Sequence, residues 1–381
     1  MTAVQIALEI LLCFVPVWIG LVAVLLPSIL FRRHLGPYGK LMGSAAGSVG
    51  LGLVLFWLLT ALFADAIVTA NPLEQVSGMK NALPGTPVPD QAGRYYLLGG
   101  DNLARDVFSR MVMGSRIVLA IAPAATLFAY LAGFMLGLPA GYFGGRFDTA
   151  LSFIANLVLA FPVILLFYLL VTPEIRASGI PTVAAAILFL FPILFFVVLV
   201  WSRFSTQPRK LWLYLAIGLP LGVWAYSGLA FNADPLGVFS IDANRLNIFV
   251  SVVFVNAPVV FRIVRGITMD IRTRDYIAAA QTRGETPWYI MLWEILPNAR
   301  GPLIVDFCLR IGYTTILLGA LGFFGLGVSP ESPDWGTTIN DGRKLLSIYP
   351  HPALPPALAL MSLVLGLNLL ADGLREQSLK D

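Results

Sequence analysis

The chain has 381 residues, of which 58% are hydrophobic and 12% are charged, and its mean hydropathy is +0.82. One water-soluble core cannot bury so large an apolar share, so part of the chain must lie in a lipid bilayer. The net charge is only +4, and the basic residues are dispersed between apolar runs, which argues against nucleic-acid binding.

Nine apolar segments are long enough to cross a bilayer as helices, which satisfy their own backbone hydrogen bonds in lipid. They cover residues 5–31, 43–66, 117–141, 148–171, 181–201, 211–231, 247–264, 301–327 and 352–371. Continuous apolar runs exclude the short alternating strands of a membrane barrel. We therefore expect an all-α polytopic membrane protein.

The charges between these segments predict which side of the membrane each loop faces. Basic residues cluster after the first, fifth and seventh segments, and the positive-inside rule places such loops in the cytoplasm. Arg32 and Arg33 follow the first segment, and no basic residue precedes it, so we expect an uncleaved anchor rather than a signal peptide. The amino terminus is then expected outside and the carboxyl terminus in the cytoplasm.

Two longer loops, residues 67–116 and 329–350, are expected on the outer side. Both contain turn-forming glycines and prolines. Within the first loop, residues 102–115 predict an amphipathic helix that lies on the outer membrane interface.

No sequence feature indicates that this chain carries out chemistry itself. A phosphate-binding G-x-x-x-x-G-K-[ST] loop, an H-E-x-x-H pair and a G-x-S-x-G turn are all absent. Cys13 and Cys308 lie in apolar runs, and His34 and His351 are far apart in the sequence, so neither disulfides nor a metal site is indicated. We expect no enzyme activity, and no cofactor or metal bound by this chain.

One pair of charges falls inside an apolar segment. Asp306 and Arg310 are four residues apart in the eighth segment, so they share one helix face. They could line a polar pathway, which would suit a secondary transporter. Alternatively, they neutralise each other near the cytoplasmic end, with Arg310 reaching toward water.

The cytoplasmic loop between the seventh and eighth segments has an unusual pattern. Three alanines, Ala278 to Ala280, give a short helix a thin surface that another protein can approach closely. Gly284 permits a sharp turn after it, and Pro297 is expected to end the next helical stretch. An ordinary amphipathic loop is the alternative interpretation.

The spacing of this loop resembles the coupling-loop motif of ABC importer permeases: Glu-Ala-Ala, three residues, Gly, nine residues, then Ile-x-Leu-Pro. Ala278 stands where the motif has Glu, and Glu294 stands where it has Ile. The resemblance implies contact with a separate ATPase through Asp275, Tyr276, Ala278, Ala279, Ala280, Gly284, Ile295, Leu296 and Pro297.

Other stretches are similar to the dipeptide and oligopeptide permease family, in particular its C-type subunit. They comprise residues 98–116, 141–148, 324–328, 335–336 and 367–375, and the likeness covers about 43–171 and 247–376. It implies a type I ABC importer transmembrane domain of about nine helices, with a six-helix core, one additional amino-terminal helix and an inserted pair. The expected organisation is an extra helix and basic loop (1–42), the permease domain (43–376) and a short tail (377–381), with the outer loop at 67–116, the inserted pair at 181–231 and the coupling loop at 265–300.

The resemblance also implies partners and a location. They are a second permease subunit, two ABC ATPase subunits that hold ATP and Mg, and an extracytoplasmic solute-binding protein, assembled in the bacterial inner membrane to import peptides or a related small polar solute. Asp101, Arg105, Asp106 and Trp335 are candidate contacts to the binding protein. Arg105 and Asp106 could instead attach the interfacial helix to the helix bundle.

Overall fold

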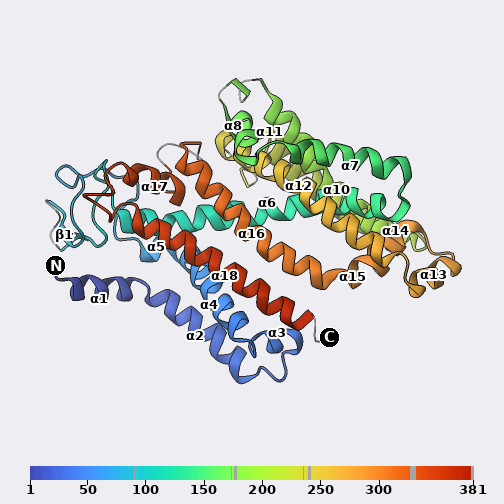
Figure 1. Cartoon of the computed structure of the whole chain (residues 1–381), viewed down its shortest axis with the longest axis horizontal. Helices are drawn as coiled ribbons and strands as arrows, with labels where there is room; N and C mark the ends of the chain where they lie inside the picture. Colours follow the sequence, from blue (N-terminus) through green and yellow to red (C-terminus); the bar gives the residue numbers. More distant parts are fainter. Residues whose placement is uncertain are drawn as a thin grey trace. The chain divides into compact units, whose positions relative to one another are not determined.

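The computed structural model describes residues 1–89, 91, 93–172, 174–175, 178–234, 236–238, 242–326 and 332–378. Residues 327–331, which include the start of the second outer loop, and residues 379–381 of the expected tail lie outside these ranges. The described chain consists of helices and connecting loops, with one two-stranded antiparallel ladder in which β1 (Thr86–Pro87) pairs with β2 (Tyr95–Tyr96) (Figure 1). The expected all-α polytopic architecture is confirmed.

Among the described residues, seven helices are long and apolar enough to cross a membrane. They are α4 (Ala45–Leu62), α6 (Val107–Phe143), α10 (Ile180–Phe204), α11 (Pro208–Phe231), α12 (Ala243–Ile271), α16 (Arg300–Phe323) and α18 (Leu354–Ser378). Two bent pairs bring the number to nine: α1 (Ala3–Cys13) with α2 (Val15–Leu30), and α7 (Gly145–Ala160) with α8 (Val163–Val171). These nine coincide with the predicted segments.

Both bends occur at prolines, which remove a backbone donor and clash with the preceding turn. Pro16 opens α2 at a bend of 55°, and Pro162 precedes α8 at a bend of 92°. The shorter helices are α3 (Gly36–Leu41), α5 (Ala64–Ile67), α13 (Asp275–Thr282), α14 (Pro287–Tyr289), the π-helix η1 (Ile290–Ile295), α15 (Leu296–Asn298) and α17 (Trp335–Arg343).

The predicted interfacial helix at 102–115 is wrong. Residues 102–104 form a turn, and α6 begins at Val107 and continues without a break to Phe143. Val107, Phe108, Val112 and Ser115 are all fully buried, so this part of the chain has no solvated face with which to lie on a membrane surface.

The contacts divide the chain into two compact units. Unit 1 contains Met1–Pro123 and Ile304–Asp381, and unit 2 contains Ala124–Leu303. The division at residues 42 and 376 rests on sequence likeness and stays a prediction.

Glycines allow close helix packing in both units. In unit 1, α18 runs beside α4 (Figure 1), and a Cβ at Gly373 would lie 2.5 Å from the Gly47 Cα. In unit 2, Gly133, Gly137 and Gly141 repeat every four residues on α6 and face α12. Helices in lipid are not held together by the hydrophobic effect and depend on van der Waals packing instead. Small residues at this spacing let the helices approach closely enough for that packing.

Candidate functional site

We define the coupling segment as residues 275–297, which lie wholly in unit 2. Its first helix, α13, presents two different faces. Ile277 and Ala280 are fully buried, whereas Ala278 and Ala279 are exposed and Tyr276 is 38% exposed. The thin outward surface predicted from three alanines is therefore formed by two of them, since the third packs inward.

Gly284 ends α13 in the way the sequence indicates. Its φ is +77°, a conformation that residues with a Cβ adopt at a cost. Its N–H donates to the Gln281 carbonyl at 2.9 Å, and the Glu285 N–H donates to the Ala280 carbonyl at 3.3 Å. These two bonds form a Schellman motif, which satisfies the last carbonyls of the helix and turns the chain sharply.

The second half of the coupling segment is anchored in the protein by buried side chains. Thr286 begins α14 by accepting a hydrogen bond from the Tyr289 N–H at 3.3 Å. The π-helix that follows buries four apolar side chains, those of Ile290, Met291, Leu292 and Ile295. These buried side chains fix the segment against the helices that it packs against.

Pro297 does not end a helical stretch as predicted. It lies in α15, which continues directly from the π-helix, and the chain stays helical for one more residue, through Asn298. Glu294, at the position where the family motif has Ile, is partly exposed and pairs with Arg283 at 3.0 Å. The buried isoleucine is the next residue, Ile295.

Polar contacts join α12 and α13 to the end of α6. Arg272 donates from Nη1 to the carbonyls of Gly141 and Tyr142, both at 2.9 Å. Gln281 Nε2 donates to the Tyr142 hydroxyl at 3.0 Å. An ion pair between Arg265 and Asp148 links α12 to α7. Sequence reasoning noted residues 141–148 as a family-like stretch but assigned them no contact, because the partners are more than a hundred residues away.

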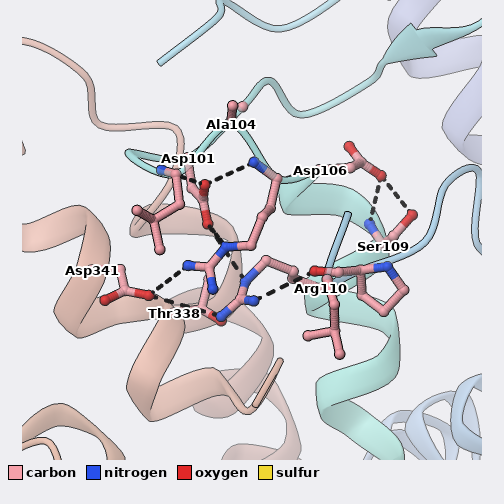
Figure 2. Close-up of polar contacts among 12 residues, drawn as sticks. Asp101, Ala104, Asp106, Ser109, Arg110, Thr338 and Asp341 are labelled. Atoms are coloured by element: carbon pink, nitrogen blue, oxygen red, sulfur yellow. Dashed lines mark hydrogen bonds and ion pairs between the residues drawn. The ribbon is translucent and has the colours of Figure 1, made fainter. Parts of the chain in front are cut away.

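A second polar cluster lies in unit 1 (Figure 2). Asp101 Oδ1 accepts the N–H of Arg105 at 2.9 Å, and Asp101 Oδ2 accepts its Nε at 2.7 Å. The same guanidinium donates from Nη2 to Asp341 of α17 at 2.8 Å, and Arg110 Nη2 donates to the Ser332 carbonyl at 3.1 Å. The cluster joins the loop before α6 to the loop that carries α17.

The four residues predicted to touch a binding protein are all inside the fold. Asp101, Asp106 and Trp335 are fully buried, and Arg105 is 2% exposed. Buried side chains offer no surface to a partner, so the predicted direct contact is wrong for these residues. Their bonds instead fit the alternative role of attaching loop to helix bundle.

Asp106 and Trp335 show how this attachment works. Asp106 precedes α6 and accepts hydrogen bonds from the N–H and hydroxyl of Ser109 at 2.9 and 2.5 Å. Burial raises the pKa of the Asp106 carboxyl, and these hydrogen bonds oppose the rise. Trp335 donates from Nε1 to the Met111 carbonyl at 2.8 Å and packs edge-on against Trp57.

Asp306 and Arg310 pair with each other on α16, with Nε of the arginine 3.0 Å from Oδ2 of the aspartate. Their side chains are 21% and 10% exposed, respectively. This pairing agrees with mutual neutralisation, and the pathway role stays a prediction. Among the residues that the structure describes, no cluster of three or more His, Cys, Asp or Glu side chains could hold a metal ion.

Residues 133–378 match the family model described as "Binding-protein-dependent transport system inner membrane component". This match covers more than half of the chain. The chain belongs to this family. The permease is thus a multi-pass inner-membrane component of a transporter that works with a solute-binding protein and an ATPase.

The permease is also similar to peptide-family ABC importer permeases. It is 32% identical over 279 residues to the glutathione transport system permease protein GsiD of Pectobacterium atrosepticum, covering 73% of this chain and 70% of the relative. It is 28% identical over 328 residues to the dipeptide transport system permease protein DppC of Alkalihalophilus pseudofirmus, covering 86% and 83%. DppC of Haemophilus influenzae is 26% identical over 329 residues, covering 86% and 88%. A secondary transporter is not favoured by these matches.

Proposed function

We propose that this permease forms half of the translocation path of an ATP-driven importer, and that its coupling segment docks on a separate ATPase. The observation that carries the proposal is the exposed pair Ala278 and Ala279 on a short helix whose opposite face is buried. The small side chains let a partner approach the helix backbone, while Ile277 and the π-helix tie the segment to the membrane helices.

ATP and Mg would be bound by the two ATPase subunits, and a second permease subunit would complete the path. Closure of the ATPase pair on ATP would pull the coupling segment and shift the membrane helices between two arrangements. The substrate class is a peptide or a related small polar solute, which the names of the dipeptide and glutathione permeases support.

The orientation is proposed with the amino terminus outside and the carboxyl terminus in the cytoplasm. In support of this orientation, the terminal amino group of Met1 donates to the Gly85 carbonyl at 3.1 Å, within the loop expected on the outer side. For contact with the solute-binding protein we propose the exposed apolar residues of that side, Leu346 at 49% and Ile348 at 66% exposure, in place of the buried residues named above.

The docking proposal is tested with the same charge at two adjacent positions. Ala279→Glu should reduce the amount of ATPase that copurifies with the permease at least about tenfold, because an unpaired charge buried in an interface costs several kcal/mol. Ala278→Glu is the matched control, since the family motif has Glu at that position. Both variants should reach the membrane at the normal level. An unchanged ATPase yield with Ala279→Glu, measured by mass spectrometry after purification in mild detergent, would refute docking through this surface.

A further inference from the structure

Helix α10, the first of the inserted pair α10–α11, contacts the coupling segment. Trp293 of the π-helix donates from Nε1 to the hydroxyl oxygen of Ser202, near the end of α10, at 3.0 Å. Arg203, the next residue, has its guanidinium carbon 5.0 Å from the centre of the Trp293 ring and donates from Nη1 to the Tyr289 hydroxyl at 3.3 Å. Two adjacent residues of the insertion therefore hold two aromatic residues of the coupling segment.

The Ser202 contact has a defined hydrogen-bond direction. The Ser202 hydroxyl has one proton, which it donates to the Leu199 carbonyl of its own helix at 2.9 Å. Its lone pairs are therefore available to accept the indole N–H of Trp293. Ser202 is only 6% exposed, so its bond to the indole is largely shielded from competing water.

The position of Trp293 in the π-helix makes this contact mechanically relevant. Its neighbours Leu292 and Ile295 are buried, while Trp293 itself is only partly buried. A π-helix is uncommon and is frequently found at functional sites. The core holds one part of this turn, and α10 holds another.

We propose that the inserted pair α10–α11 braces the coupling segment, with Ser202 and Arg203 acting as positioning residues for Trp293 and Tyr289. The proposal rests on the proposed docking of this segment on an ATPase. Movement of the ATPase is then passed to α10 as well as to the helices of the family core. Loosening the brace should leave the ATPase bound but make its ATP hydrolysis less well coupled to the membrane helices.

The test uses the assembled complex of permeases and ATPase, purified in mild detergent. The variants are Trp293→Phe, which keeps the ring and removes the N–H, Ser202→Ala, which removes the acceptor, and both together. The matched controls are Trp212→Phe, whose side chain is 69% exposed on α11, and Ser227→Ala, whose hydroxyl donates to the Trp224 carbonyl of its own helix.

Amide hydrogen exchange of residues 287–298, followed by mass spectrometry, reports the brace directly. In each single variant the amides of residues 287–298 should exchange about five to ten times faster, which is the effect of losing one hydrogen bond. Both substitutions remove the same bond, so exchange in the double variant should be no faster than in either single variant. The controls should match the unchanged protein. Unaltered exchange in both single variants would overturn the brace.

ATP hydrolysis by the same complexes measures the role of the brace in coupling. Stimulation of hydrolysis by the solute-binding protein should fall about threefold or more in the single variants, at an unchanged ATPase content. Full stimulation despite faster exchange would overturn the positioning role. If the coupling segment does not dock on the ATPase, Ala279→Glu will retain the ATPase. The hydrogen-exchange measurement does not depend on that result, and it still decides whether the brace exists.

Discussion

Gly50 of α4 lies against the backbone of Leu370 in α18, so that a Cβ at position 50 would stand only 2.3 Å from the Leu370 nitrogen. Backbone cannot yield as a flexible side chain can, and Gly50→Ala should push the two helices apart at a cost of about 1–3 kcal/mol. Gly52 is two residues away, and the nearest atom that a Cβ there would meet in the described part of the chain is Leu25 Cδ1, at 4.0 Å.

Thermal unfolding in detergent compares these two substitutions. Gly50→Ala should lower the melting temperature, whereas Gly52→Ala should leave it unchanged or raise it, because Ala is favoured over Gly in a helix by up to about 1 kcal/mol. Equal effects at the two positions would contradict the close approach of α4 and α18.

Gly284→Pro should remove ATPase association without affecting membrane insertion. Proline requires a negative φ and has no N–H to donate to Gln281, whereas Gly284 has a φ of +77° and makes that bond. Among the described residues, no atom beyond the two chain neighbours lies within 4 Å of a Cβ at this position, so Gly284→Asn is the control. Asn tolerates the left-handed conformation and should retain the ATPase. Loss of the ATPase in both variants would show that the turn itself is not the cause.

Arg105→Lys should be nearly as disruptive as Arg105→Ala. The guanidinium bonds Asp101 through Nε and Asp341 through Nη2, a fork that one ammonium group cannot reproduce. Removing the arginine leaves Asp101 buried without its closest cation, which costs on the order of 3–5 kcal/mol. The melting temperature should fall in both variants, whereas Arg94→Ala, which removes an exposed side chain, should have no effect. Normal stability of Arg105→Lys would contradict the need for the fork.

Asp106 should make the stability of the permease depend on pH. In the unfolded chain the Asp106 carboxyl titrates at about pH 4, and burial raises the pKa of this carboxyl in the folded protein. The stabilising contribution of the proton is therefore complete below about pH 4 and is lost as the pH rises through the folded pKa. Asp106→Asn removes this titration. The melting temperature of this variant should therefore rise relative to that of the unchanged protein as the pH increases from 4 to 8.

The helix cap supplies the control for that measurement. Asp106→Ala removes the acceptor for the Ser109 N–H and should be less stable than Asp106→Asn by about 1 kcal/mol at every pH. A constant difference between the unchanged protein and Asp106→Asn across this range would refute the pKa shift.

Ile348→Lys should weaken binding of the loaded solute-binding protein to the permease complex. The side chain is 66% exposed, so a charge there leaves folding unaffected but is costly in an apolar interface. Surface plasmon resonance with the reconstituted complex measures the affinity, and Leu83→Lys, at another exposed apolar residue of the outer loops, is the control. An equal effect of both substitutions would argue against a specific contact at Ile348.

The turn at Gly284 in the coupling segment was predicted correctly because it is a local feature. A left-handed turn after a short helix requires a residue such as Gly284, and this requirement can be read from a dozen residues. The inward orientation of Ala280 was missed, because which side of a short helix is buried depends on the elements that surround it. The contacts of Trp293 with α10 were missed for the same reason, since Ser202 is 91 residues away in the chain.

The sequence by itself determined that the chain crosses a membrane, with which segments, and to which family it is similar. Transfer of a run of apolar residues into lipid depends on those residues alone, so nine spans could be counted without a structure. Only the tertiary structure decided the role of the charges. The sequence left two roles open for Arg105, contact with a binding protein or attachment to the helix bundle, and the structure buries it against Asp341, 236 residues further along the chain. A buried charge is stable only beside its partner, and the fold determines which partner that is.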